Sequence, residues 1–218
     1  MIPIIKMYNS SKYKRLIIIS IISIFSLGIF AAFLVDNNIK KEREQRISKN
    51  KKEDNENFKS LKTGDIIFQT RKRTDTIDNK IAIIDVDIHG YTVLEITDRV
   101  QHTSLRSWVK NNGSYTVKRL NNSDSIFTEQ NTKIFRKEKQ KFIFKPYDDS
   151  HCWSDNKIYD SELIWKTYKR ALDIELCKLD ASSISRKNID NQENCSNSYY
   201  ISSTAIFDSK KLLTVIEK

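Results

Sequence analysis

The chain has 218 residues, which suits one folded domain and an additional segment rather than two full domains. Hydrophobic residues make up 39% and charged residues 30%, with only 4 Gly and 2 Pro, so the composition excludes collagen-like and low-complexity chains. The net charge is +10, but residues 63–218 hold 25 basic and 22 acidic side chains. The excess charge lies near the N-terminus, and a nucleic-acid-binding domain or partner is therefore not expected.

A basic N-terminal tail, residues 1–15, precedes twenty residues without a charge, residues 16–35. Twenty apolar residues in a helix span about 30 Å, the thickness of the hydrocarbon core, so the pattern predicts a transmembrane helix. A cleaved signal peptide is the alternative, but such peptides have apolar runs of about 7–15 residues that end in a small-residue cleavage site. Here Phe33–Val35 continue the apolar run, which favours an uncleaved anchor whose partner is the lipid bilayer.

Residues 36–62 are rich in charges of both signs and contain few large apolar side chains. This composition is typical of a solvated stalk between a membrane anchor and a folded domain. We therefore place the domain at residues 63–218. Lys and Arg are nearly balanced on the two sides of the apolar run, so charge does not decide its orientation in the membrane.

The pattern of the domain predicts strands followed by a helix, which indicates an α+β fold. His89-Gly90 separates two apolar runs as a tight hairpin turn. No element is assigned to the polar residues 121–140. The predicted strands are 65–69, 80–88, 91–97 and 115–120, and the predicted helices are 103–109 and 161–172.

A series of short motifs follows the same order as in one known family. The motifs are Gly64–Gln69, Val93–Glu95, Leu105–Trp108, Tyr115–Arg119, Lys145–Asp148, Trp153–Asp155, Ile158–Lys166, Ala171–Leu176, Ala205–Asp208 and Leu213–Val215. The domain thus resembles the YiiX/YaeF-type permuted papain-like amidases, a branch of the NlpC/P60 superfamily. The resemblance implies a small antiparallel sheet packed on helices, preceded here by the transmembrane helix.

The resemblance also implies a thiol hydrolase site, in which a Cys at a helix N-terminus is activated by a His that opens the second strand. A third polar residue orients that His. This chain departs from the pattern at two of the three positions. Asp160 stands at the Cys position and Lys80 at the His position, and only the third position, Glu95, is retained.

Other residues are weaker candidates for the chemistry. Cys152 is considered as a replacement nucleophile, with a buried or loop thiol as the plain alternative, and the disulfide state of Cys152, Cys177 and Cys195 is left open. Glu162 and Glu95 are considered as a carboxylate pair for acid–base catalysis. The His residues lack metal-ligand spacing, so neither a metal nor a cofactor is expected.

A binding groove is predicted around the former active site, lined by Tyr147, Trp153, Tyr159 and Glu162. Its ligand is a peptide, a lipid or a protein, while simple core packing is the alternative for the aromatic residues. The favoured hypothesis is a membrane-anchored, catalytically inactive homologue that acts by binding. The alternatives are an active amidase or acyl-bond hydrolase with other catalytic residues, and a structural or protective membrane protein. By analogy with the family, the domain is placed outside the inner membrane.

The replaced pair preserves opposite charges, since a carboxylate and an ammonium stand where a thiolate and an imidazolium are expected. We therefore predict that Lys80 approaches Asp160 across the groove and that Glu95 is the second anion beside them. In the alternative, Lys80 points to solvent and Asp160 only caps its helix.

Overall fold

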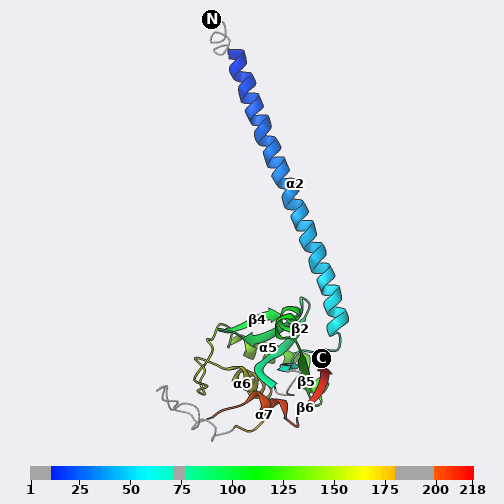
Figure 1. Cartoon of the computed structure of the whole chain (residues 1–218), viewed down its shortest axis with the longest axis vertical. Helices are drawn as coiled ribbons and strands as arrows, with labels where there is room; N and C mark the ends of the chain where they lie inside the picture. The colour runs from blue at the N-terminus through cyan, green and yellow to red at the C-terminus, as the bar shows by residue number, and fades with distance from the viewer. Residues whose placement is uncertain (1–10, 71–76, 180–198) are drawn as a thin grey trace. The chain divides into compact units, whose positions relative to one another are not determined.

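The computed structural model describes residues 11–70, 77–179 and 199–218 and consists of two compact units, Met1–Glu53 and Asp54–Lys218 (Figure 1). The first ten residues of the predicted basic tail lie outside the described part. Helix α2 (Ser11–Phe58) contains the predicted apolar run, and most of its described large side chains, such as Leu16, Phe25 and Val35, are exposed. In the described part of the chain, this helix is the one that is long and apolar enough to cross a membrane.

The domain is built on a six-stranded antiparallel sheet with the strand order β4-β3-β2-β1-β5-β6. The four strands predicted from sequence are all present in it. The strands are β1 (Ile66–Thr70), β2 (Ile77–Asp87), β3 (Gly90–Ile96), β4 (Val100–Ser104), β5 (Tyr115–Leu120) and β6 (Leu212–Glu217). The fold is therefore the α+β arrangement that was expected.

The helices differ in part from the expected ones. The helix predicted from residue 103 begins at Leu105, because Thr103 and Ser104 belong to β4 and the Ser104 hydroxyl accepts the N-cap bond from Ser107. Residues 121–140, for which the sequence predicts no helix or strand, contain two helices. The helices of the domain are α3 (Leu105–Asn112), α4 (Ser123–Ile126), α5 (Glu129–Gln140), α6 (Asp160–Leu172) and α7 (Ser203–Phe207).

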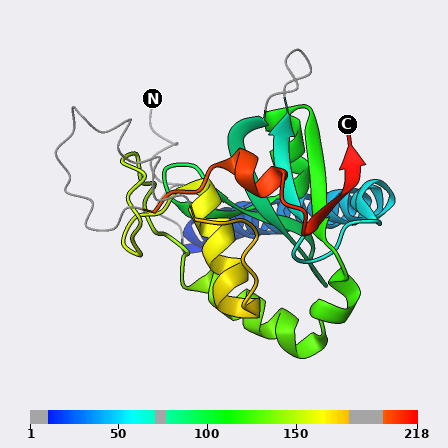
Figure 2. The same ribbon diagram turned by 90° about the horizontal axis from the view of Figure 1, so that it is seen from below.

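Alternate residues of β1, β2 and β3 enter two separate cores, as the period of a strand requires. One core contains Ile66, Phe68 and Ile83 together with residues of α5 and α6, which lie side by side (Figure 2). The other contains Ile67 and Ile84 together with residues of α3. Helix α6 is thus held against the sheet, and its N-terminus is fixed relative to β2.

The folded domain begins earlier in the chain than residue 63. Phe58 and Leu61 are only 6% and 4% exposed and belong to the α3 side of the core. The ring of Phe58 lies 5.7 Å from the ring of Tyr91. These two apolar residues stand in an otherwise polar sequence, which is why the composition assigned them to the stalk.

Candidate functional site

Asp160 is the first residue of α6. Tyr159 occupies the cap position with an extended backbone and makes no side-chain cap hydrogen bond, so the expectation that Asp160 caps the helix is wrong by one position. The chain reaches the helix through a short parallel pairing of Ile158 with Tyr147, which sets the point where helical geometry starts. A carboxylate in the first turn remains favourable there, because the helix dipole is positive at its N-terminus.

The carboxyl group of Asp160 is enclosed and incompletely bonded. The residue as a whole is half-buried, but its Oδ1 atom is buried and has no hydrogen-bond partner. Burial raises the pKa of Asp160 to about 7, and the charge of Glu95 acts in the same direction. The charge of Lys80 and the backbone N–H groups of Asp160 and Ile96 act to lower the pKa. At neutral pH the group is therefore divided between its protonated and ionised forms.

Lys80 lies close to Asp160 but binds a different carboxylate. Its Nζ atom lies 3.0 Å from Oε2 of Glu95 and donates a hydrogen bond of 2.6 Å to the carbonyl oxygen of Ile96. The expected direct pair with Asp160 is not formed, and the ammonium group instead contacts Glu95 and Ile96 on the adjacent strand β3. The three residues that the resemblance aligns with the catalytic positions are nevertheless brought together, since Lys80 and Glu95 both act on the pKa of Asp160.

Glu162 is buried and belongs to a separate ionic network. Its Oε1 atom lies 2.6 Å from Nζ of Lys166 and accepts a hydrogen bond from the backbone N–H of Ser154. Lys166 also pairs with Asp155 at 2.8 Å. Burial raises the pKa of Glu162 to about 7, although Lys166 acts against this change. Glu162 and Glu95 are thus held by different lysines, so the structure gives no support to a catalytic pair of these two glutamates.

The three aromatic residues of the predicted groove belong to two aromatic clusters. Trp153 packs against Trp165 and Tyr199 with ring distances of 5.4 and 6.1 Å, and the Lys166 ammonium lies 4.6 Å from its ring centre. The second cluster, which we call the tyrosine cluster, consists of Tyr147, His151, Tyr159 and Tyr200. Its Tyr159 is buried, and its hydroxyl accepts a hydrogen bond from the backbone of Ile201.

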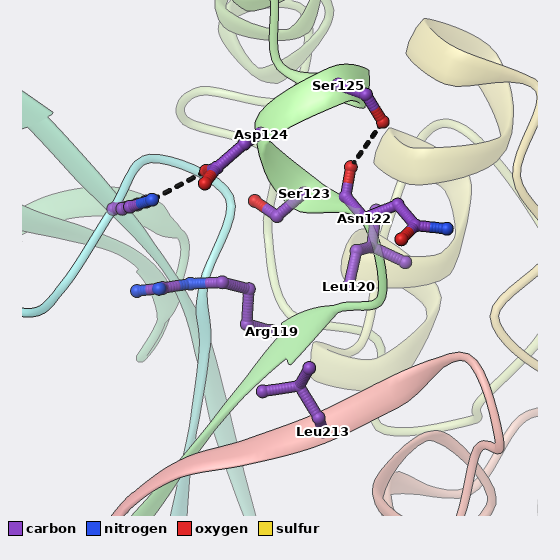
Figure 3. Close-up of a pocket in the computed structure, with 8 residues that line it drawn as sticks. Arg119, Leu120, Asn122, Ser123, Asp124, Ser125 and Leu213 are labelled. Atoms are coloured by element: carbon purple, nitrogen blue, oxygen red, sulfur yellow. Dashed lines mark hydrogen bonds and ion pairs between the residues drawn. The ribbon is translucent and has the colours of Figure 1, made fainter.

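A separate pocket of about 440 Å³ lies between α4 and the ends of β5 and β6 (Figure 3). Its charged residues are already paired: Lys62 with Asp124 at 2.5 Å and Arg119 with the buried Asp65 at 2.6 Å. It includes none of the predicted groove residues, so it does not correspond to the site expected from sequence.

The two cysteines that the structure describes are poorly suited to nucleophilic attack. Cys152 is disulfide-bonded, which removes the thiol that a replacement nucleophile needs. Cys177 is free, but burial raises the pKa of its thiol to about 11, so little thiolate forms at neutral pH. Cys195 lies outside the described residues.

A sequence model of the "permuted papain-like amidase enzyme, YaeF/YiiX, C92 family" matches residues 60–216. The chain belongs to this family. The permuted papain-like match covers the whole sheet and the helices α3 to α7, in agreement with the resemblance found from the motifs.

Two YiiX proteins of Escherichia coli are similar to the chain. The uncharacterized protein YiiX of strain K12 is 31% identical in an alignment of 182 positions that covers 72% of this chain and 86% of that protein. The crystal structure of metalloprotein YiiX from strain O157:H7 has a TM-score of 0.61 at 23% identity, over 73% of this chain and 98% of that one. This second likeness shows the shared fold of the permuted papain-like family.

The O157:H7 protein is called a metalloprotein. Within the described ranges, no three His, Cys, Asp or Glu side chains converge in a way that could hold a metal ion. Beside Asp160, the ammonium group of Lys80 already pairs with Glu95. The described residues of this site therefore do not fit a metal centre.

Sequence reasoning missed three residues near Asp160. His151 and Tyr200 join Tyr147 and Tyr159 in the tyrosine cluster, and Asp148 is buried beside it. Asp148 stood within one of the family motifs, Lys145–Asp148, which was a signal that could have found it. The other two depend on the path of loops, which periodicity does not reveal.

Changing Asp160 to Asn should alter the pH dependence of stability. Because the folded pKa is raised, the folded chain holds the proton more tightly than the unfolded chain, and the native state loses stability as the pH rises from about 4 to about 7. At pH 8 the free energy of unfolding of Asp160→Asn should therefore exceed that of wild type by about 1–3 kcal/mol, a range that allows for the partial exposure of Asp160. At pH 5 this difference in the free energy of unfolding should be smaller.

Urea unfolding of the full chain in detergent micelles at pH 5 and pH 8 measures this difference. The matched control is Asp173→Asn, an exposed carboxylate paired with Lys169, which should not become more stable as the pH rises. An Asp160→Asn variant that is equally or less stable than wild type at pH 8 would contradict the raised pKa.

Proposed function

We propose that this chain is a membrane-anchored, catalytically inactive member of the permuted papain-like family that acts by binding a ligand at the former active site. The observation that carries the proposal is the carboxyl group of Asp160 at the helix start where the family resemblance places a nucleophilic thiol. A carboxylate is far less nucleophilic than a thiolate, and Lys80 bonds to its own sheet in place of an activating imidazole. The described cysteines offer no substitute, because Cys152 is in a disulfide and the thiol pKa of Cys177 is raised.

The apolar half of α2 supports the membrane anchor. Its side chains are exposed and its hydropathy is high over a length that matches the hydrocarbon core. The disulfide of Cys152 supports an extracytoplasmic domain, since disulfides persist in oxidising compartments such as the periplasm and are rare in the cytosol. Both points agree with a domain tethered to the outer side of the inner membrane.

One observation favours a second candidate, a hydrolase that uses carboxyl groups. The pKa of Asp160 is raised to about 7, near the value that suits a general acid or base, and Glu95 provides a second carboxylate nearby. We rank this candidate lower because Glu95 is held by Lys80.

Introducing a cysteine at position 160 and a histidine at position 80 should create a reactive thiol. All variants carry Cys177→Ser, which removes the free thiol, and no reductant is added. The reference chain with only this change should be labelled slowly by a fluorescent iodoacetamide at pH 7. Asp160→Cys should be labelled faster, and Asp160→Cys with Lys80→His should be labelled about tenfold or more faster than Asp160→Cys alone, because an imidazolium and the helix N-terminus lower the thiol pKa. Mass spectrometry locates the label. Rapid labelling of the Cys177→Ser chain with Asp160 intact, or hydrolysis of amide or acyl substrates that depends on Asp160, would refute the inactive assignment.

The anchor should keep the chain in the membrane with residues 16–35 intact. After alkaline carbonate extraction, the full chain should remain in the membrane pellet, and a variant that lacks residues 16–35 should be released. N-terminal sequencing checks that the segment is uncut. A soluble product that begins after Val35 would instead identify the segment as a cleaved signal peptide.

A further inference from the structure

The tyrosine cluster lies directly beside Asp160. The rings of Tyr159 and Tyr200 are stacked with centroids 5.7 Å apart, and the ring of His151 lies 5.0 Å from Tyr159 and 6.2 Å from Tyr147. Tyr147, His151 and Tyr200 are each only half-buried, so part of this aromatic surface is open to a ligand. The backbone of His151 is left-handed, with φ 54°, a conformation that costs energy for a non-glycine residue and is common at binding sites.

Three carboxylates near the cluster have a buried oxygen atom without a hydrogen-bond partner. They are Asp160 (Oδ1), Glu162 (Oε2), whose other oxygen is held by Lys166, and Asp148 (Oδ2), a residue that is only 1% exposed. The second oxygen of Asp148 accepts hydrogen bonds from the backbone and hydroxyl of Ser150. A buried carboxylate oxygen that lacks a partner is rare, and each such atom calls for a hydrogen-bond donor such as a water molecule or a bound ligand.

The electrostatic surroundings indicate the charge of a ligand that would bind there. Burial raises the pKa of Tyr147, and the charges of Asp160, Asp149 and Asp148 raise it further. Burial also raises the pKa of Tyr159, and the charges of Glu162 and Asp148 act in the same direction. Lys80 is already bonded to Glu95 and Ile96, so it does not supply the missing bonds to either aspartate. The cluster is therefore anionic, and it would repel a carboxylate or phosphate ligand.

Aromatic rings next to carboxylates suit one class of cation. Ring faces attract ammonium groups through their quadrupole, and desolvated carboxylates add charge-assisted hydrogen bonds. A metal ion is a poorer fit, because no three metal-ligating side chains converge in the part of the chain that the structure describes. We infer that the tyrosine cluster, with Asp148 and Asp160, binds an organic ammonium group. This inference rests on the proposed binding function and names the chemical class of its ligand.

Titration of the full chain in detergent micelles with ammonium salts tests this site. The probes are tetramethylammonium chloride, for quaternary groups of the lipid type, and ethylammonium chloride, for primary amines, with sodium chloride at equal ionic strength as the reference. Tyrosine ring signals in NMR spectra provide the readout. At pH 8 at least one ammonium probe should shift the signals of Tyr147 and Tyr200 in a saturable manner, while sodium should not.

Four variants make the result specific. Asp148→Asn and Tyr147→Leu should each weaken binding about tenfold or more, whereas Tyr147→Phe keeps the ring and should bind within about threefold of wild type. Asp124→Asn, an exposed residue of the separate pocket, should bind as wild type does. Equal shifts with sodium, or unchanged binding by Tyr147→Leu and Asp148→Asn, would overturn the inference.

The outcome separates this inference from the proposed function. Failure of both ammonium probes in a chain that remains unreactive toward iodoacetamide would overturn the ligand class and leave the inactive assignment standing. Saturable ammonium binding by a chain that also hydrolyses amide or acyl bonds would support the ligand class and overturn the inactive assignment.

Discussion

The ion pair between Lys80 and Glu95 determines the properties of the site. Because Glu95 and the Ile96 carbonyl take up the lysine ammonium, Asp160 has no direct counter-ion and its enclosed oxygen has no partner. Burial of that carboxyl then outweighs the more distant attraction of Lys80, and its pKa rises toward neutrality. A site of the thiol hydrolase type has the opposite arrangement, in which a second charged group stabilises the ionised nucleophile.

The fold explains why these groups meet despite their separation in sequence. Helix α6 packs with α5 against one face of the sheet, which brings the start of α6 toward the strands that carry Lys80 and Glu95. The segment that contains Tyr147 pairs with residues 98–100 on one side and with Ile158 on the other. The loop therefore lies between the sheet and the helix start, and it places the tyrosine cluster next to Asp160.

The sequence predicted those parts in which a single physical signal dominates. The strands β1, β2, β3 and β5 alternate or concentrate apolar residues, and α6 repeats them at helical spacing, so all five were found. Strand β4 was missed because Val100–Ser104 is mostly polar, and α5 because its inward face includes Lys139, a buried lysine paired with Asp85 at 2.5 Å. At the site, the family motifs identified Lys80, Glu95 and Asp160, but the choice of Glu95 as the lysine's partner depends on three-dimensional distances. The tyrosine cluster joins residues more than fifty positions apart, which no local pattern encodes.

Asp160, at the position that the family resemblance assigns to the nucleophile, carries a buried carboxyl oxygen and has no direct counter-ion. A ¹³C NMR titration of the aspartate side-chain carboxyl groups in the full chain measures this most directly, with the Asp160 signal assigned by its absence in Asp160→Asn. The account predicts that Asp160 titrates with a midpoint near 7, well above the exposed aspartates. A midpoint near 4, the ordinary value for aspartate, would mean that the carboxylate is solvated or directly paired and would contradict the account.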